Sequence, residues 1–262
     1  MTIVHRVVPI VRLDAEGQLL EPFSRGGIDV AYVGSVCGFH CRDGADEIWL
    51  QLVNPDGRGV RSLFDVVKTV RPMAQVPITV WGGIQSASDA RLLVELGADR
   101  VVVDVEPDYE DALDRAQSIA DAVGPDALTV AMRTRRLAAN PKVTWEAATP
   151  DGERSGYDAT LLALELAKRG AGEIALMLLD EKGVVHDADL VERLAERLHI
   201  QLVSLGEERS LDELATPLLM GADAIASYRL FADGSCSVID VKRRLQEFGA
   251  TARPSEPPYA HT

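Results

Sequence analysis

The sequence predicts a single α/β domain, a (β/α)8 TIM barrel built from two similar half-barrels. Three observations support this fold class. The length of 262 residues suits one such barrel, which needs about 250 residues. Short β-rich runs alternate with amphipathic segments along the whole chain, and a pattern of motifs repeats between the two halves.

Eight β-rich runs are the expected barrel strands. Most are continuously apolar, as parallel strands are when helices cover the sheet. They occupy residues 5–11, 47–53, 77–81, 100–105, 127–132, 173–179, 200–204 and 224–227. Eight strands alternating with helices indicate a closed parallel barrel, and a doubly wound open sheet is the alternative.

Helical patterns fill the intervals between these runs. They include residues 86–96, 107–123, 157–168, 187–196 and 237–248. Ser86 and Asp187 stand where a helix N-cap is expected, because their side-chain oxygens accept from the free amides of a first turn. Gly97 and Gly170 stand just after a helix, where a positive φ favours glycine.

The internal repeat favours the barrel over the open sheet. The pattern GADEI at 44–48 recurs as GAGEI at 170–174, and GAD at 97–99 recurs at 221–223. Two copies of a four-strand unit make an eight-stranded barrel with pseudo-twofold symmetry. We assign residues 1–250 to the barrel and expect a Pro-rich disordered tail over 251–262. A polar insert over 134–156 is expected to be a lid or a disordered loop.

Bulk composition narrows the function classes. The net charge of −14, from 27 basic and 41 acidic side chains, argues against nucleic acid or an anionic membrane as partner. The N-terminus lacks the apolar region of a signal peptide, and no apolar run reaches the roughly 18 residues of a membrane span. With only three cysteines, we expect a cytoplasmic protein. Cys37 and Cys41 lack zinc-ligand spacing, so no metal site is predicted. We also expect no cofactor.

Binding chemistry in such a barrel belongs to the loops that follow the strands. Glycines and hydroxyl groups there suit two phosphate sites on opposite sides of the mouth, because backbone N–H groups approach a phosphate closely at glycine. The candidates are Gly82, Gly83, Gly183, Ser204, Gly206, Ser227 and Arg229, with Lys182 beside Gly183. The structural alternative is that these glycines only make tight turns.

Charged residues also end several strands. Arg12 follows the first run and Arg133 the fifth, so both are expected to face the mouth as a clamp for a small anionic substrate. Alternatively, each arginine pairs with a rim carboxylate, the candidates being Asp14, Glu21, Asp104 and Asp180. Asp104 and Asp180 are best placed for acid–base work, although such aspartates also serve as caps or ion-pair partners.

Four charges stand at the opposite ends of the strands. They are Arg6, Glu47, Arg100 and Glu173. Charges at the ends of buried strands are costly unless paired, so two of each sign predict a ring that closes the barrel floor. This ring is either structural or a gate through which something small passes from a partner docked below.

The stretches 76–104 and 166–183 carry a family resemblance that covers residues 3 to about 250. The chain resembles the cyclase subunit of imidazole glycerol phosphate synthase, from the histidine-biosynthesis barrel family. The resemblance implies a (β/α)8 barrel that binds a substrate with two phosphates. It also implies lyase and cyclase chemistry on ammonia, which a glutaminase subunit on the lower face delivers through the barrel core. The four floor charges match the gate residues of that family.

The rim departs from the family pattern. Arg12 and Arg133 stand where the family has two catalytic aspartates, and Arg229 stands where it has a serine. We therefore predict a diverged cyclase-type enzyme for a small phosphorylated or carboxylated substrate. One alternative is a non-catalytic barrel that binds or regulates a glutaminase or a true cyclase. Another is a genuine histidine-biosynthesis cyclase that uses Asp14.

Overall fold

A computed structural model describes most of the chain in full atomic detail. The described residues are 4–20, 23–25, 28–30, 32–53, 60–105, 108–137, 144–149, 152–181, 183–207, 210–232 and 236–253. Lys182, Glu21 and residues 254–262 of the expected tail lie outside these ranges.

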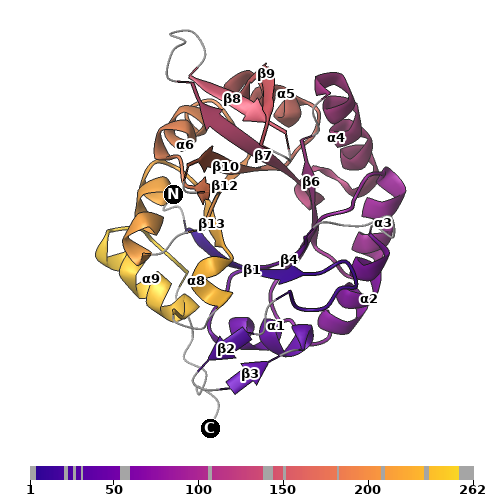
Figure 1. Ribbon diagram of the computed structural model, residues 1–262, viewed down its shortest axis with the longest axis vertical. Coiled ribbons are helices and arrows are strands. Elements are labelled where there is room, and N and C mark those ends of the chain that lie inside the picture. The colour runs from indigo at the N-terminus through magenta and orange to yellow at the C-terminus, as the bar shows by residue number, and fades with distance from the viewer. Residues whose placement is uncertain are drawn as a thin grey trace.

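Eight parallel strands form a closed barrel at the centre of the molecule (Figure 1). They are β1 (Arg6–Leu13), β4 (Ile48–Leu52), β5 (Ile78–Trp81), β6 (Arg100–Asp104), β7 (Leu128–Arg136), β10 (Glu173–Asp180), β12 (Gln201–Gly206) and β13 (Ala224–Ser227). Each strand pairs with its neighbours in this order, and β13 pairs with β1, which closes the ring. The predicted fold class and all eight predicted strands are confirmed.

Helices surround the barrel as an outer layer (Figure 1). They are α1 (Val33–Arg42), α2 (Arg61–Val70), α3 (Ala87–Glu95), α4 (Tyr109–Val123), α5 (Ala159–Lys168), α6 (Ala188–Ala195), α7 (Ala215–Leu219), α8 (Arg229–Ala232) and α9 (Val238–Glu247), with the 3-10 turns η1 (Pro125–Ala127) and η2 (Leu211–Leu214). The predicted caps are confirmed: Ser86 forms a capping box with Asp89, and Asp187 accepts from the amide of Leu190.

Matching hydrogen bonds in the two halves confirm the half-barrel repeat. In the first half, the amide of Ile78 donates to Asp99 Oδ2 at 2.8 Å, and the amide of Asp99 donates to the Ile78 carbonyl at 2.8 Å. In the second half, Leu202 and Asp223 make the same two bonds at 2.8 Å each. Gly97 and Gly221 precede these aspartates, and both have a φ of 111°.

The described part of the insert over 134–156 is an ordered antiparallel extension of β7, so the expected disorder is wrong there, and a role as a lid stays a prediction. Strand β7 extends to Arg136 and pairs antiparallel with β8 (Trp145–Ala148), which pairs with β9 (Arg154–Asp158). The Trp145 indole donates to Asp187 Oδ2 at 2.6 Å and ties this extension to α6. Two further hairpins involve β2 (Phe23–Arg25) with β3 (Ile28–Val30), and β11 (Gly183–Val185) with β10.

The start of the expected tail joins the barrel. The amide of His5 donates to the Thr251 carbonyl at 2.7 Å, and Ala252 is buried. His5, just before β1, and the segment that follows α9 are therefore held together at the floor.

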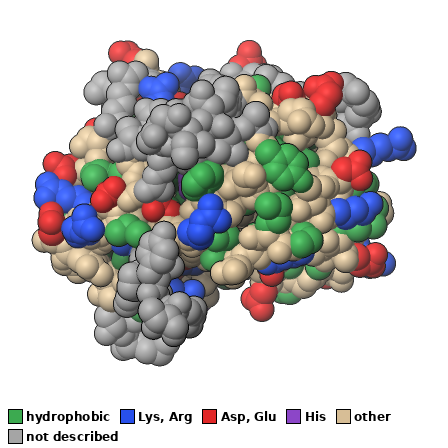
Figure 2. Space-filling model, turned by 90° about the horizontal axis from the view of Figure 1, so that it is seen from below, with side chains coloured by type: hydrophobic (Ala, Val, Ile, Leu, Met, Phe, Trp, Pro, Cys, Tyr) green, Lys and Arg blue, Asp and Glu red, His purple; other side chains and the backbone are tan. Residues whose placement is uncertain are grey.

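The core has two apolar layers on either side of the barrel wall. The larger layer lies between strands and helices, and the smaller one fills the space inside the barrel, here called the lumen. On the face seen in Figure 2, hydrophobic, basic and acidic side chains are intermixed. This surface agrees with a core that is buried inside one domain.

Candidate functional site

The mouth of the barrel holds an ion pair between two neighbouring strands. Arg133 Nη1 on β7 lies 2.6 Å from Asp104 Oδ1 on β6, and their side chains are 20% and 26% exposed. The second oxygen of Asp104 accepts from Trp81 Nε1 at 2.9 Å. Both arginine and aspartate face the lumen, because side chains alternate along a strand and Ala131 and Val102 two residues earlier are lumen residues. The structural alternative predicted for Arg133, pairing with Asp104, is what the structure shows.

Arg12 also enters the mouth but has little charge compensation. Its guanidinium carbon lies 4.7 Å from the centre of the Tyr228 ring, within the range of cation–π attraction. Its only carboxylate within 4.0 Å among the described residues is Glu207, at 3.8 Å from Nη1. Arg12 Nε is buried and has no hydrogen-bond acceptor among the described residues. Burying a donor without an acceptor is costly, and none of the described residues offsets that cost.

The two arginines occupy equivalent places in the two halves. Arg12 lies opposite Gln51 on β4, and Arg133 lies opposite Met177 on β10, 126 residues after Gln51. On its other side, each arginine has a neighbouring strand whose mouth residue differs between the two halves. Asp104 and Tyr228 are 124 residues apart, the offset that also separates Asp99 from Asp223. Tyrosine therefore takes the place in the second half that a carboxylate takes in the first.

Backbone geometry accounts for three of the four predicted rim glycines. Gly82 has a φ of 108°, and a Cβ built there would come closer than 3.0 Å to the Leu52 carbonyl oxygen. Gly83 and Gly183 also have positive φ values, of 71° and 118°, and Gly183 closes the hairpin between β10 and β11. Gly206 is buried at the end of β12 and pairs with Ser227. Their role in phosphate binding stays a prediction.

The predicted serines do not face the lumen. Val203 and Leu205 are lumen residues, so Ser204 between them points toward the helical layer, where its Oγ lies 2.6 Å from His186 Nδ1. Ser227 follows the lumen residue Ala226 and is also turned outward; its Oγ is buried without a partner among the described residues. Arg229 is exposed at the start of α8.

The other predicted acids lie outside the mouth pair. Asp14 Oδ1 accepts from the amides of Glu16 at 3.0 Å and Gln18 at 2.9 Å, so this carboxylate stabilises the turn after β1. Asp180 is exposed beside the β10–β11 turn, opposite Gly183. Asp104 is therefore the predicted acid that the structure brings into the mouth.

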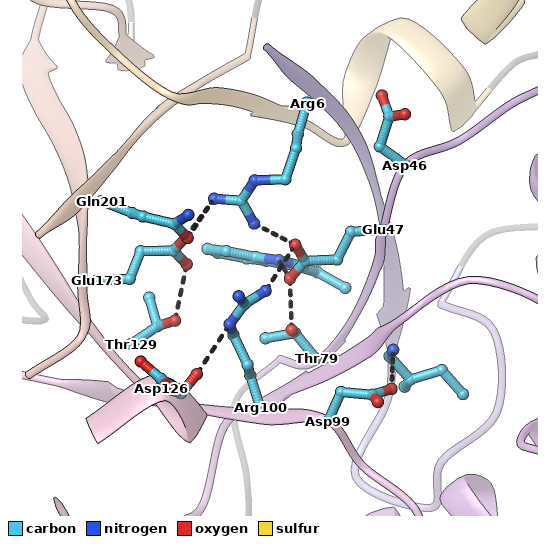
Figure 3. A network of polar contacts seen from close by, with 12 residues as sticks. Arg6, Asp46, Glu47, Thr79, Asp99, Arg100, Asp126, Thr129, Glu173 and Gln201 are labelled. Carbon is cyan, nitrogen blue, oxygen red and sulfur yellow. Dashed lines mark hydrogen bonds and ion pairs between the residues drawn. The ribbon is translucent and has the colours of Figure 1, made fainter. Parts of the chain in front are cut away.

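The four floor charges form the network drawn in Figure 3. Arg6 pairs with both Glu47 and Glu173, and Arg100 Nη1 lies 3.2 Å from Glu47 Oε2. Burial lowers the pKa of the Arg6 guanidinium, but the carboxylates of Glu173 and Glu47 raise it by more, so its pKa lies above the usual value. Arg6 therefore keeps its positive charge in this network.

Hydroxyl and indole groups complete the floor network. Thr79 Oγ1 and Trp49 Nε1 donate to Glu47 Oε1 at 2.5 Å and 2.8 Å, and Thr129 Oγ1 donates to Glu173 Oε1 at 2.8 Å. Each buried carboxylate therefore has partners for both of its oxygens, which compensates its loss of water.

Sequence reasoning missed the aromatic residues of the lumen and mouth. Trp49, Trp81 and Tyr228 contact the charged groups described above, and each was visible only as part of an apolar strand or its end. The sequence offered one signal for Trp81, namely its position. It is directly followed by Gly82 and Gly83 at the end of a strand, which places this large side chain next to the expected binding loop.

A family model described as "Histidine biosynthesis protein" matches residues 38–236, which include seven of the eight barrel strands. The chain belongs to this histidine biosynthesis family. Its relatives in the family include imidazole glycerol phosphate synthase subunit HisF of Dictyoglomus turgidum, 34% identical over 215 residues, 81% of this chain and 83% of the relative. The HisF subunit of Streptomyces coelicolor is 30% identical over 257 residues, 97% of this chain and 100% of the relative.

Membership in the histidine biosynthesis family confirms the predicted resemblance to an imidazole glycerol phosphate synthase subunit. Within the described residues, no helix has the length and apolarity to cross a membrane. Over the same residues, no three His, Cys, Asp or Glu side chains are grouped so as to hold a metal ion.

Proposed function

We propose that this protein is a diverged cyclase-type member of the histidine biosynthesis family that binds a small phosphorylated or carboxylated molecule at Arg12. One observation carries the proposal: the Arg12 guanidinium stands in the mouth with a buried Nε–H that lacks an acceptor among the described residues and with Glu207 no closer than 3.8 Å. An anion at the exposed part of this side chain, which is 27% exposed, would balance the charge.

Within this proposal, Asp104 is the acid–base group. It is lumen-facing at the mouth and partly exposed, and Arg133 and Trp81 fix its two oxygens in place. Arginine does not serve as a general acid or base near neutral pH, since its pKa exceeds about 12, so Arg12 and Arg133 bind and orient rather than transfer protons. The competing cyclase mechanism through Asp14 has less support, because that carboxylate accepts two backbone N–H groups of its own turn.

The first experiment measures binding of inorganic phosphate and of a panel of small sugar phosphates and carboxylates by calorimetry. Arg12→Gln is expected to weaken binding about 10- to 100-fold, the range for losing a charge-assisted hydrogen-bonded pair. Asp104→Asn is expected to bind at least as tightly as the wild type, since it removes a negative charge from the mouth. Exposed Arg91→Gln serves as the matched control. Equal binding by wild type and Arg12→Gln would contradict the proposed site.

A second candidate function is a non-catalytic barrel that docks a glutaminase subunit on its floor. It is supported by a complete floor ring below a mouth that has arginines where the family resemblance implies catalytic aspartates. Co-purification with a glutaminase subunit, without any turnover of ammonia, would favour the non-catalytic barrel over the diverged enzyme. Ammonia-dependent turnover of the substrate of imidazole glycerol phosphate synthase tests both candidates together. Turnover at the rate of a true cyclase would overturn both the diverged enzyme and the non-catalytic barrel, and would support the Asp14 mechanism.

A further inference from the structure

Two tryptophans fill the lumen between the floor and the mouth. Trp49 on β4 and Trp81 on β5 are 0% and 2% exposed, and they come from neighbouring strands. Their ring centroids are 6.0 Å apart at an interplanar angle of 88°. Edge-to-face packing of this kind is favourable, and it places two of the largest side chains across the same section of the barrel.

Hydrogen bonds hold this pair at both ends. Trp49 Nε1 donates to Glu47 in the floor ring at 2.8 Å, and Trp81 Nε1 donates to Asp104 at the mouth at 2.9 Å. The two indoles therefore span the distance from the lower charged layer to the upper one. Neither N–H is left for a bound water.

The rest of this section of the lumen is apolar and buried. Its lining consists of Val8, Ile10, Val102, Ala131, Ala175, Met177, Val203, Leu205, Ala224 and Ala226. A water molecule inside a protein needs about 10–15 Å³ of its own and two to four polar partners. Buried apolar side chains such as these offer no polar partners to a water molecule.

We infer that the Trp49–Trp81 pair is a plug that stops small molecules from passing between the floor ring and the mouth. The floor ring is then a closure of the barrel rather than an open gate. Any ammonia used at the mouth reaches it from the mouth side and not through the barrel core. This inference goes beyond the proposed function, because it concerns the path through the barrel and needs no ligand at Arg12.

Exchange of the Trp49 indole N–H with D2O tests the plug, because water and ammonia are similar in size. In the wild type we expect this proton to exchange on the order of 1,000-fold more slowly than free indole, as core groups do when exchange needs opening. Trp81→Phe keeps the bulk and removes the hydrogen bond to Asp104, whereas Trp81→Ala removes both. We expect protection in Trp81→Phe to stay within about tenfold of the wild type and to fall by about 100-fold or more in Trp81→Ala.

Stability measured by urea unfolding for each variant separates access through the lumen from general loosening. Backbone amides of β6 and β10 serve as internal references, and they should keep their protection in Trp81→Ala. If Trp81→Ala does not fold, Trp49→Val with the Trp81 indole as reporter replaces it. Equal acceleration of Trp49 indole exchange by Trp81→Phe and Trp81→Ala would overturn the plug, because the removed bulk would then not be the cause. That result would not bear on anion binding by Arg12.

Discussion

Replacing Glu47 by glutamine tests whether the floor ring stabilises the barrel. The Glu47 side chain is 1% exposed, and it accepts from Arg6, from Arg100 at 3.2 Å, from Trp49 at 2.8 Å and from Thr79 at 2.5 Å. Glutamine has nearly the same shape and one carbonyl oxygen, so it keeps the bonds from Trp49 and Thr79. Its NH2 group then faces two guanidinium groups, which turns two attractive contacts into unfavourable ones.

The expected cost follows from burial. Removing one partner of a buried ion pair costs about 3–5 kcal/mol, because the remaining charge stays desolvated. Arg6 and Arg100 are 18% and 23% exposed, and Arg6 keeps Glu173, so water and the second carboxylate offset part of the loss. We expect the free energy of unfolding to fall by about 3 kcal/mol, the lower end of that range. For a domain of this size, that lowers the Tm by roughly 6–12 °C.

Reversible urea unfolding monitored by circular dichroism measures this change, with exposed Glu95→Gln on α3 as the control that should stay within about 0.5 kcal/mol of the wild type. Adding Arg100→Gln to Glu47→Gln should cost less than Arg100→Gln alone, because its partner is already gone. A loss below about 1 kcal/mol for Glu47→Gln would refute the view that the ring is a coupled, desolvated network.

Three other predictions concern separate parts of the fold. Burial, with a further contribution from Cys41, raises the pKa of the Cys37 thiol to about 12. Since an unfolded thiol has a pKa of about 8.5, only the unfolded state loses this proton between the two values, and the free energy of unfolding should fall by about 2 kcal/mol from about pH 8 to about pH 10. Cys37→Ala should remove that part of the pH dependence in urea titrations. Gly82→Ala should cost about 1–3 kcal/mol more than Gly124→Ala, because both glycines have positive φ but only a Cβ at Gly82 meets the backbone; equal thermal shifts would contradict this. Asp187→Ala should cost about 2–4 kcal/mol and expose the β7–β8 extension to limited proteolysis, whereas Asp189→Ala, 65% exposed, should do neither.

The sequence was sufficient for the elements and the repeat because their signals are local. Apolar runs marked the strands, and Ser86, Asp187 and Gly97 marked helix ends through hydrogen-bonding and φ preferences that act within a few residues. The floor ring was predictable too, since charges at the start of otherwise apolar strands need partners of opposite sign, and the closed order of strands brings them together.

The direction in which rim side chains point was not predictable. A strand that is covered on one face alternates apolar and polar residues, and the alternation reveals which face is buried. Here the lumen and the helical layer are both apolar, so β12 and β13 carry no such alternation and the outward orientation of Ser204 and Ser227 left no trace in the sequence. Because this alternation is missing, the sequence also did not show that Trp49 and Trp81 face the lumen.

The two halves are most alike where the backbone requires it and least alike where side chains face the lumen. The Asp99 and Asp223 clamps are identical in geometry, because each closes the same turn before a strand. In the lumen, by contrast, Trp81 has Leu205 as its counterpart at the offset of 124 residues, and Asp104 has Tyr228.

This difference makes the mouth electrically uneven. On the Arg133 side a carboxylate at 2.6 Å neutralises the guanidinium, while on the Arg12 side an aromatic ring stands in the equivalent place and the nearest described carboxylate is 3.8 Å away. A cation–π contact leaves the arginine with its full charge and, here, with an unused donor. An anion should therefore bind off the barrel axis, next to β1 and β13, with Asp104 across the mouth from it rather than beside it.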